Sequence, residues 1–411
     1  MELTQAHTYA IQGISVEKIC QEFGTPVYVY DAEVIEKQVN KLKEAFSGLK
    51  LRIKYASKAL TNISILKLMK LYGCEVDTVS LEEIEVAIRA GFSPKEILFT
   101  PNSIHIDELA QAVAKGVFVN IDNLYILEEF GKKYGNSVPC CIRMNPHIEA
   151  GGHDKIKTGH KESKFGISID YADAIVAVVE KYNIDMIGLH IHTGSDFSDV
   201  EVFIKAADML FDFAKRFKNI KLFDFGSGFK VAYKKGDKTT DVNLLGEKIK
   251  EAVKKFASEY GSEPEIWFEP GKYLVSDSGI LFVKTNVLKK TPATTFAGVD
   301  SGLNHLIRPM MYGAYHEIIN VSNPTAQHTD FSVVGYICET DTFAWNRPLN
   351  EVREGDILAI MNAGAYGMTM SSNYNSRPRP AEVLVYKGKA HLIRRRETLE
   401  DVLRTQVEVA F

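Results

Sequence analysis

The sequence of 411 residues lacks the cysteine pattern of several specialised protein classes. Its five cysteines are Cys20, Cys74, Cys140, Cys141 and Cys338, an odd number without a CxxC pair or the Cys/His spacing of a zinc site. Neither a disulfide framework nor a structural metal is expected, and a reducing cytoplasm fits this usage best. We expect most of these thiols to be small core residues, with Cys338 as the exception.

Excess charge of one sign and long hydrophobic runs are also missing. The chain has 49 Lys and Arg against 53 Asp and Glu, a net charge of −4, which disfavours nucleic-acid binding as its main function. No apolar stretch reaches membrane-spanning length, and the start has no basic segment before an apolar run, so neither a membrane nor a secreted protein is expected. The 45% hydrophobic and 25% charged residues are typical of a globular enzyme, and the length favours a large domain plus a smaller one.

From about residue 50 to 275, short apolar runs alternate with amphipathic stretches. The eight apolar runs are Arg52–Ser57, Val76–Ser80, Ile97–Pro101, Val117–Asp122, Cys141–Pro146, Met186–Ser195, Leu222–Phe229 and Ile266–Val275. The helix-like stretches include Ser80–Ala90, which a capping box opens, Ile106–Lys115, Tyr171–Tyr182, Glu201–Phe217 and Leu244–Tyr260. Strands this apolar are typical of parallel sheets buried on both faces. The pattern predicts an α/β fold with a closed (β/α)8 barrel of the TIM type, and an open doubly wound sheet is the alternative.

After Val275 the pattern changes to strand-like segments without long helices between them. These are Ile280–Val287, Thr295–Asp300, Phe331–Cys338, Asp356–Met361 and Ala381–Tyr386, and Pro26–Tyr30 is a further strand candidate. They predict a C-terminal antiparallel β domain that the N-terminal strand completes. The expected domains are therefore a barrel over 31–280 and a β-rich domain made of 1–30 and 281–411.

Residues that follow barrel strands point toward the face where such folds carry their active sites. Lys58 follows the first strand, where it is either a surface lysine with a buried stem or an amine that forms a Schiff base. His190 and His192 alternate at the end of the sixth strand and could be half of a metal site. No acid or second histidine pair completes that site convincingly, so a stacking or hydrogen-bonding role is favoured and no metal is expected.

Glycine-rich turns follow the last two strands. Gly226-Ser227-Gly228 comes after the seventh strand, and Glu269-Pro-Gly271-Lys272 comes after the eighth. Loops at these positions frequently bind phosphate in barrels, because glycine lets backbone N–H groups approach an anion closely. A short Gly-x-Gly alone is also found in simple tight corners, but its position here favours an anion site, with Lys272 as a nearby cation.

The C-terminal region contains polar segments that strand scaffolding does not require. One is Cys338-Glu339-Thr-Asp341, which follows an apolar strand, and another is the Asn362-Ala-Gly-Ala-Tyr366-Gly stretch. A third is Arg377-Pro-Arg379-Pro, which could also be a rigid turn.

Taken together, these motifs resemble the diaminopimelate decarboxylases, which are alanine-racemase-like, fold type III enzymes dependent on pyridoxal phosphate (PLP). The motifs that carry the resemblance are Tyr55-Ala-Ser-Lys58-Ala, His190-Ile-His192-Thr-Gly-Ser195, Gly226-Ser-Gly228, Glu269-Pro-Gly-Lys272, Cys338-Glu339 and Arg377-Pro-Arg379-Pro-Ala-Glu-Val-Leu. They occur in the family's order and extend from about residue 25 almost to the end of the chain.

The resemblance implies a cofactor site in the barrel. Lys58 would bind PLP as a Schiff base, His192 would stack on the ring, and Glu269 would face the ring nitrogen, where a carboxylate favours the protonated pyridine. The residues that the resemblance assigns to the cofactor are Lys58, Asp77, His192, Ser195, Gly226, Ser227, Gly228, Glu269, Gly271, Lys272 and Tyr366.

The resemblance also implies a reaction and a substrate. Meso-2,6-diaminopimelate would lose CO2 to give L-lysine, the last step of lysine biosynthesis, with Cys338 as the general acid. In this family the cysteine comes from the partner subunit, so a homodimer with shared active sites is expected. The residues assigned to the substrate are Lys272, Arg308, Tyr312, Glu339 and Tyr366, of which Arg308 would bind the retained carboxylate and Glu339 the distal ammonium. The spacing of Arg308 and Tyr312 does not show that they meet.

Two positions depart from the family pattern. Lys272 stands where arginine is usual, which keeps the charge but loses the planar fork for a bidentate contact. Ser227 stands where glycine is usual, and serine would be strained there if the position required a positive φ. Neither change affects Lys58 or Cys338.

Four other functions are weighed against this prediction. A decarboxylase of ornithine, arginine or carboxynorspermidine could share the fold, but Arg308 and the Arg-Pro-Arg-Pro segment argue against it. A racemase would leave Cys338 and Glu339 without a role. A binding protein that has lost PLP does not explain the presence of both Lys58 and Cys338. A metal-dependent hydrolase would depend on the His190 and His192 pair alone.

Overall fold

The computed structural model describes residues 1–148 and 161–411, which form two compact units. The barrel unit consists of residues 37–232 and 237–274. The β-rich unit consists of residues 1–36, 233–236 and 275–411. The sequence predicts boundaries after residues 30 and 280, whereas the chain passes between the units after residues 36 and 274.

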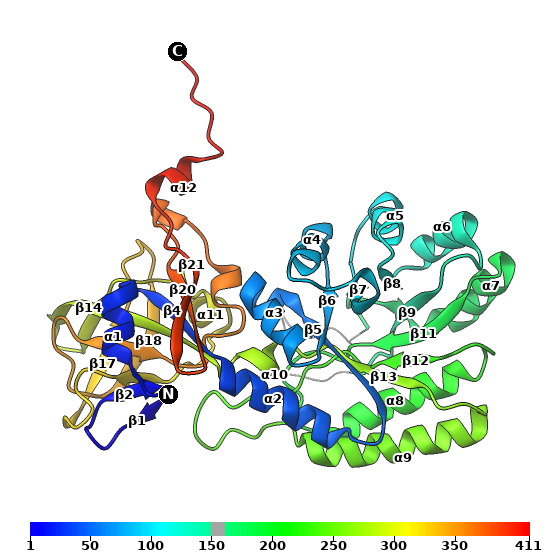
Figure 1. Ribbon diagram of the computed structural model, residues 1–411, viewed down its shortest axis with the longest axis horizontal. Coiled ribbons are helices and arrows are strands. Elements are labelled where there is room, and N and C mark those ends of the chain that lie inside the picture. Colours follow the sequence, from blue (N-terminus) through cyan, green and yellow to red (C-terminus); the bar gives the residue numbers. More distant parts are fainter. Residues whose placement is uncertain (149–160) are drawn as a thin grey trace. The chain divides into compact units, whose positions relative to one another are not determined.

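The barrel unit is built on eight parallel strands that close on themselves (Figure 1). They are β5 (Lys50–Ala56), β6 (Glu75–Thr78), β7 (Ile97–Phe99), β8 (Phe118–Ile121), β9 (Cys140–Asn145), β11 (Met186–Ile191), β12 (Leu222–Asp224) and β13 (Glu265–Phe268). The pairing of β13 with β5 completes the ring, and the short β10 (Ile167–Ser168) lies beside the end of β9. The predicted TIM-type barrel is confirmed, and the open doubly wound sheet was the wrong alternative.

Helices between the strands form the outer layer of this unit (Figure 1). They are α3 (Ile63–Leu71), α4 (Leu81–Arg89), α5 (Ile106–Ala114), α6 (Leu124–Tyr134), α7 (Ala172–Tyr182), α8 (Val200–Ala214) and α9 (Val242–Tyr260). Each of the five stretches predicted to be helical overlaps one of them, although α8 and α9 begin one and two residues before the predicted starts. At α4 the Ser80 hydroxyl accepts the N–H of Glu83 at 3.1 Å, as a capping box requires. The Glu83 carboxylate accepts the N–H of Val79, however, and not that of Ser80.

Three of the predicted barrel strands extend four or more residues too far. The run Ile266–Val275 contains a strand only to Phe268, because Pro270 has no N–H for a ladder and residues Lys272–Val275 form the short helix α10. The strands β11 and β12 also stop early, at Ile191 and Asp224, and glycines with positive φ follow each of them. The apolar side chains beyond these ends are buried in loops, so hydrophobicity alone did not mark where pairing stops.

The β-rich unit has a sheet in the order β18-β17-β15-β14-β4-β20-β21, with β19 and β16 attached to β14. The bounds are β4 (Val27–Asp31), β14 (Gly279–Lys290), β15 (Thr295–Val299), β16 (Ile318–Asn320), β17 (His328–Val334), β18 (Thr342–Asn350), β19 (Ile357–Ile360), β20 (Ala381–Tyr386) and β21 (Lys389–Arg394). Most pairs are antiparallel as expected, but β15 with β17 and β4 with β20 are parallel, so the sheet is mixed. The N-terminal strand pairs with β14 and β20, which joins both ends of the chain in one core.

The remaining helices and strands are short except for α2, which has 14 residues. They are β1 (Glu2–Leu3), β2 (Tyr9–Ile11), β3 (Ile14–Ser15), α1 (Val16–Phe23), α2 (Ala32–Ala45), α11 (Arg308–Tyr312) and α12 (Leu399–Leu403). The predicted strand Phe331–Cys338 ends at Val334, so Cys338 lies in a loop and not at a strand end.

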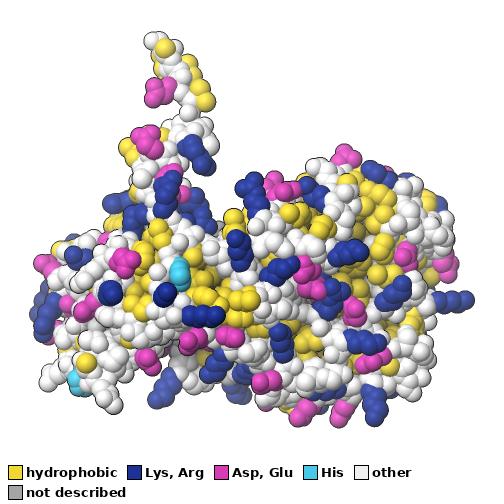
Figure 2. Space-filling model, in the orientation of Figure 1, with side chains coloured by type: hydrophobic (Ala, Val, Ile, Leu, Met, Phe, Trp, Pro, Cys, Tyr) yellow, Lys and Arg dark blue, Asp and Glu magenta, His cyan; other side chains and the backbone are white. Residues whose placement is uncertain are grey.

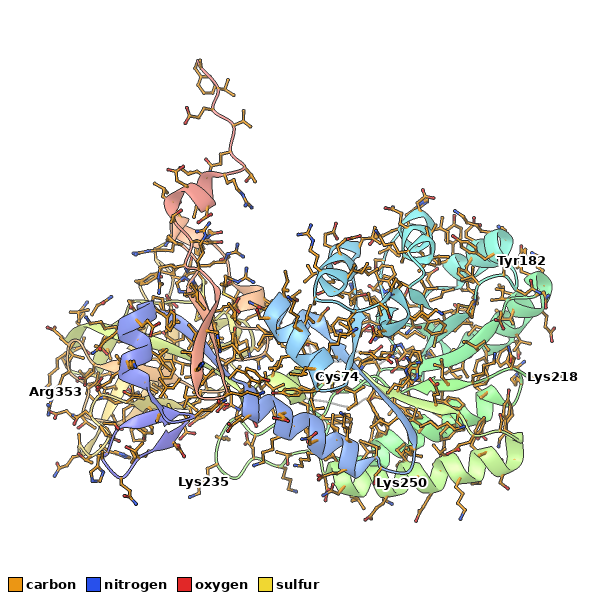
Figure 3. All side chains as sticks on the ribbon, viewed as in Figure 1. Cys74, Tyr182, Lys218, Lys235, Lys250 and Arg353 are labelled. Atoms are coloured by element: carbon orange, nitrogen blue, oxygen red, sulfur yellow. The ribbon has the colours of Figure 1, made fainter. Side chains whose placement is uncertain are left out.

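Side chains are distributed as the composition suggests. Basic and acidic groups are interspersed on the face in Figure 2. Cys20, Cys74, Cys140 and Cys141 are buried, whereas Cys338 is exposed, and all five thiols are free. Figure 3 labels the buried Cys74, and Lys250 on α9. Among the described residues, no helix combines the length and the apolar character that a membrane span requires.

The close contact between α9 and the last residue of α2 generates a stability prediction. A Cβ atom at Gly246 would lie 2.1 Å from the carbonyl oxygen of Ala45, a backbone atom that cannot rotate away. Gly246→Ala should therefore lower the free energy of unfolding by about 1–3 kcal/mol, although alanine favours helices. Urea denaturation followed by circular dichroism measures this change. Glu247→Ala, on the exposed side of the same helix, is the control and should be neutral within about 0.5 kcal/mol.

Candidate active site

Five ionisable side chains lie buried at the carboxyl ends of the barrel strands. They are Asp77 on β6, Arg143 on β9, His190 on β11, Asp224 on β12 and Glu269 just after β13, and none is more than 8% exposed. Buried charges are costly unless they are paired or serve a function. Their common position identifies this end of the barrel as the candidate active site.

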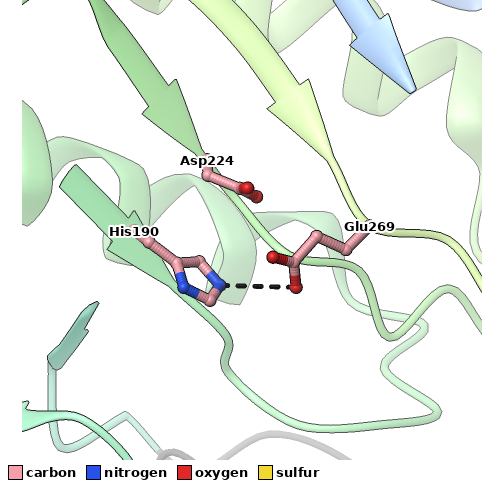
Figure 4. Close-up of side chains that lie close together, drawn as sticks. All are labelled: His190, Asp224 and Glu269. Atoms are coloured by element: carbon pink, nitrogen blue, oxygen red, sulfur yellow. Dashed lines mark ion pairs between the residues drawn. The ribbon is translucent and has the colours of Figure 1, made fainter. Parts of the chain in front are cut away.

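Three of these groups form a compact cluster (Figure 4). The His190 Nε2 atom lies 3.6 Å from Glu269 Oε2, and Asp224 completes a set whose nitrogen and oxygen atoms lie within 4.8 Å of one another. Asn120 donates to His190 Nδ1, which places the imidazole proton on Nε2, facing Glu269. The expectation that no acid completes a set with His190 is wrong, because the parallel pairing of β11 with β12 and of β12 with β13 brings Asp224 and Glu269 beside it. That the site has no metal stays a prediction.

Burial raises the pKa of all three buried acids at this end of the barrel, Asp77, Asp224 and Glu269. Desolvation, followed by the charge of Asp224, raises the pKa of Glu269 to about 8. Desolvation likewise raises the pKa of Asp224 to about 7 and that of Asp77 well above its usual range. Burial and the positive charge of Arg143 hold the pKa of His190 well below its usual range. A cation is therefore the charge that this site accommodates best.

Lys58 provides such a cation. It lies in a 3₁₀ turn, Ser57–Ala59, directly after β5, and its side chain is exposed. Its ammonium group lowers the pKa of both Asp77 and Glu269, so the amine lies within electrostatic range of the cluster. The predicted position of Lys58 at the barrel mouth is thus found in the structure, beside acids that the sequence did not group with it.

The turn Gly226–Gly228 has the backbone that its sequence suggests. Gly226 and Gly228 have φ values of +58° and +106°, and a Cβ atom at Gly228 would lie 2.0 Å from the carbonyl oxygen of Gly194. Ser227 does not adopt a positive φ, so serine is not strained there. Its N–H donates to His192 Nδ1 at 3.2 Å, which connects this turn to the segment that contains Ser195. A glycine turn of this kind fits an anion such as phosphate.

Lys272 has a partner that the sequence analysis did not identify. Its ammonium group forms an ion pair with Asp196, the residue after Ser195, and the two side chains are 10% and 21% exposed. Gly271 precedes it, and a Cβ atom there would lie 3.0 Å from the Cβ of Ala59. The Gly271–Lys272 segment therefore packs against the turn that contains Lys58.

Cys338 lies in the β-rich unit on a loop held by Asp341. The Asp341 carboxylate is buried and accepts the N–H groups of Leu303 at 2.7 Å and Ile337 at 3.0 Å. The N–H of Gly335 donates to the Asp341 carbonyl at 2.8 Å, so both ends of the loop meet. This anchor keeps the neighbouring Cys338 and Glu339 exposed on a defined backbone.

The exposed thiol has polar neighbours from a second loop. Asn375 Nδ2 donates to Cys338 Sγ at 3.3 Å, and the Tyr374 hydroxyl lies 4.0 Å from the same sulfur. Tyr374 donates to Glu339 Oε1 at 2.9 Å, and this bond raises the pKa of Tyr374 to about 12. Cys338, Glu339 and a protonated tyrosine thus form one exposed polar group.

Arg308 and Tyr312 lie close together in the structure. The Arg308 guanidinium lies 5.9 Å from the Tyr312 ring centroid and 5.3 Å from that of Tyr233, and it donates to the Tyr233 hydroxyl at 3.2 Å. Tyr366 has a φ of +56°, an uncommon conformation for tyrosine that is often found at functional sites. These residues belong to the β-rich unit.

The predicted site residues thus fall into two sets. The barrel unit contains Lys58, Asp77, His192, Ser195, Gly226, Ser227, Gly228, Glu269, Gly271 and Lys272, and the β-rich unit contains Arg308, Tyr312, Cys338, Glu339 and Tyr366. Six further residues belong to these clusters although no sequence motif marked them, namely Asn120, Arg143, Asp196, Asp224, Tyr374 and Asn375. Arg143 could have been noticed as the charged residue in an otherwise apolar strand.

Comparisons with known proteins agree with this picture. Residues 32–276 match the family described as "Pyridoxal-dependent decarboxylase, pyridoxal binding domain". A diaminopimelate decarboxylase of Methanothermobacter thermautotrophicus is 39% identical over 96% of this chain and 95% of its own length, and one of Bacillus subtilis is 36% identical over 96% and 94%. The crystal structure of diaminopimelate decarboxylase from Helicobacter pylori complexed with L-lysine has a TM-score of 0.87, is 34% identical and covers 94% of this chain and 98% of its own.

The Gly226–Gly228 turn generates a prediction on cofactor retention. Gly228→Ala should weaken PLP binding at least about tenfold, because its Cβ would displace the Gly194 carbonyl as well as strain the backbone. Equilibrium dialysis with absorbance detection of PLP measures the affinity. Gly236→Ala is a matched control, because φ is +88° there but no atom lies within 4 Å of the added Cβ. Equal PLP affinity in the two variants would contradict the assignment.

Proposed function

The chain belongs to the pyridoxal-dependent decarboxylase family, within which its relatives are diaminopimelate decarboxylases, and on that premise we propose that it converts meso-2,6-diaminopimelate to L-lysine and CO2. The observation that carries the proposal is the buried acid cluster beside Lys58, at the barrel end where the Gly226–Gly228 turn also lies. Near full-length similarity to the curated relatives supports the choice of substrate.

The barrel residues fit PLP chemically. An exposed amine at Lys58 can bind an aldehyde, the glycine turn can bind a phosphate, and a buried carboxylate at Glu269 can hold a proton on a ring nitrogen. When bound, PLP supplies the electron sink for the pair left behind by the departing carboxylate. Burial raises the pKa of Glu269 in the protein alone. A protonated ring nitrogen beside it would supply a positive charge that stabilises the carboxylate, so the raised pKa fits this role.

Cys338 is the residue that we assign to proton delivery. After CO2 leaves, its thiol would give a proton to the substrate Cα atom, so that hydrogen replaces the carboxylate. Asn375 donates to the sulfur and can stabilise the thiolate that remains. The loop held by Asp341 would keep this sulfur in place through the turnover.

The far end of the substrate provides the specificity. Diaminopimelate retains an ammonium and a carboxylate there, so it needs both an acid and a base from the protein. Arg308 can bind the carboxylate, with its position held by Tyr233 and Tyr312. Glu339 accepts one hydrogen bond from Tyr374 and has a second oxygen for the ammonium. Lys272 and Tyr366 complete the proposed substrate contacts.

We also propose that the protein is a homodimer with shared active sites and that it is located in the cytoplasm. Cys338, Glu339 and Tyr374 are exposed on the β-rich unit, as is suitable for groups that act in a partner's site. Five free thiols fit a reducing compartment.

The product formed from meso-diaminopimelate tests the proposed function. The purified PLP-loaded enzyme should release CO2 and L-lysine in equal amounts, and at a higher kcat/KM than with ornithine, arginine or carboxynorspermidine. Lys58→Ala is the negative control and should show no turnover, because the amine that holds the cofactor is gone. A higher kcat/KM on any of the other three amino acids would refute the substrate assignment.

Replacing the cysteine tests its proposed role separately. Cys338→Ala should lower kcat by about 10²–10⁴-fold, because a positioned proton donor is lost, while PLP affinity stays unchanged. Stopped-flow kinetics and PLP absorbance give both quantities. Thr340→Ala, in the same exposed loop, should retain wild-type activity. Normal turnover in the cysteine variant would remove Cys338 from the mechanism.

A further inference from the structure

The end of the barrel opposite the candidate active site contains a cavity of about 550 Å³. Much of its lining comes from residues at or just before the starts of strands, such as Phe118 on β8, Leu222 on β12 and Glu265 on β13, and Trp267 contributes from further along β13. We call it the basal cavity. Its volume lies within the range of about 300–1,000 Å³ that is typical of small-molecule sites.

The floor of the basal cavity is apolar and rigidly held. Trp267 and Leu222 are buried in one hydrophobic cluster, against which Phe118 and Ile187 pack as partly exposed residues. The Trp267 indole N–H donates to Glu265 at 2.8 Å, and the ammonium of the fully buried Lys54 lies 4.2 Å from its ring centroid. The indole is therefore a preorganised aromatic surface.

The basic side chains that line the basal cavity differ in whether they have ion-pair partners. Arg52 is engaged by the carboxylates of Glu75 and Glu265. Lys95 and Lys221 also line the cavity, and within residues 1–148 and 161–411 neither forms an ion pair. Two ammonium groups without carboxylate partners thus lie beside a cavity lined by apolar and aromatic side chains.

From this geometry we infer that the basal cavity binds a small amphipathic organic anion. The occupant would be an aromatic carboxylate or sulfonate, with its ring against Trp267 and Phe118 and its anionic group toward the exposed rim, where Lys95 and Lys221 lie. Burial of the ring supplies most of the affinity, and the two lysines select the charge. This site differs from the proposed catalytic site in position and in ligand, and the inference does not depend on the proposed function.

Fluorescence from Trp267 can test binding directly. The chain has two tryptophans, and Trp345 is 53% exposed in the β-rich unit, so Trp345→Phe leaves Trp267 as the single indole. The PLP-loaded Trp345→Phe protein is titrated with 8-anilinonaphthalene-1-sulfonate, and energy transfer from the indole to the probe is recorded. We expect saturation at one probe per chain. Absence of saturable energy transfer would overturn the inference.

Charge reversal tests the role of the two lysines. Lys95→Glu with Lys221→Glu should weaken binding of the sulfonate probe about tenfold or more. Lys67→Glu with Lys250→Glu makes the same change in net charge on the outer helices and should have little effect. The uncharged analogue N-phenyl-1-naphthylamine should bind more weakly and respond to neither pair. Equal weakening by both pairs, or equal affinity for both probes, would overturn the inference.

Filling the cavity tests its location. Ile187→Phe should reduce binding of both probes, and Val113→Phe, at a different part of the lining, provides a second variant if the first does not fold. Circular dichroism and PLP absorbance confirm that a variant is folded. Unchanged binding in a folded variant would place the probe elsewhere and overturn the inference.

Discussion

Closure of the parallel barrel is the constraint on which the candidate active site depends. The pairing of β13 with β5 completes a ring in which the carboxyl ends of all strands lie at one end. Asp77, His190, Asp224 and Glu269 are far apart in the sequence, and the ring makes them neighbours. Some strands have only three residues, so each polar side chain lies immediately above the apolar interior. His190, Asp224 and Glu269 come from three successive strands, and closure of the sheet is what brings Asp77 beside them.

This arrangement stores unfavourable electrostatic energy. Three acids share a buried region, and each has a raised pKa because water is excluded and because acids lie beside one another. Arg143 and Lys58 offset part of this cost. Clusters of buried acids with shifted pKa values are typical of sites that bind a ligand. Here the site has more acidic groups than nearby positive charges can offset. The proposed protonated ring nitrogen has that charge, which links the energetics of the fold to the proposed chemistry.

The β-rich unit exposes polar and reactive side chains on a loop whose backbone is held by buried hydrogen bonds. The buried carboxylate of Asp341 accepts two backbone N–H groups, and the thiol of Cys338 stays exposed on the same loop. A rigid support beneath an exposed loop is how proteins combine access with accurate positioning. The basal cavity shows the opposite arrangement, in which an aromatic floor lies near Lys95 and Lys221, and neither lysine has an acidic partner in the part of the chain that the structure describes.

The amino-acid sequence by itself determined the strand and helix alternation, the barrel class and the residues that carry recognisable motifs, such as Lys58 and Cys338. These properties are local, because hydrophobic periodicity and short motifs can be read along the chain. Only the tertiary structure decided that Asp224 lies beside His190 and that Asp196 pairs with Lys272. It also decided that Ser227 does not have a positive φ and that Cys338 lies in a loop held by Asp341. Such facts depend on contacts between segments distant in the sequence, and no local pattern encodes which of many buried polar residues will become neighbours.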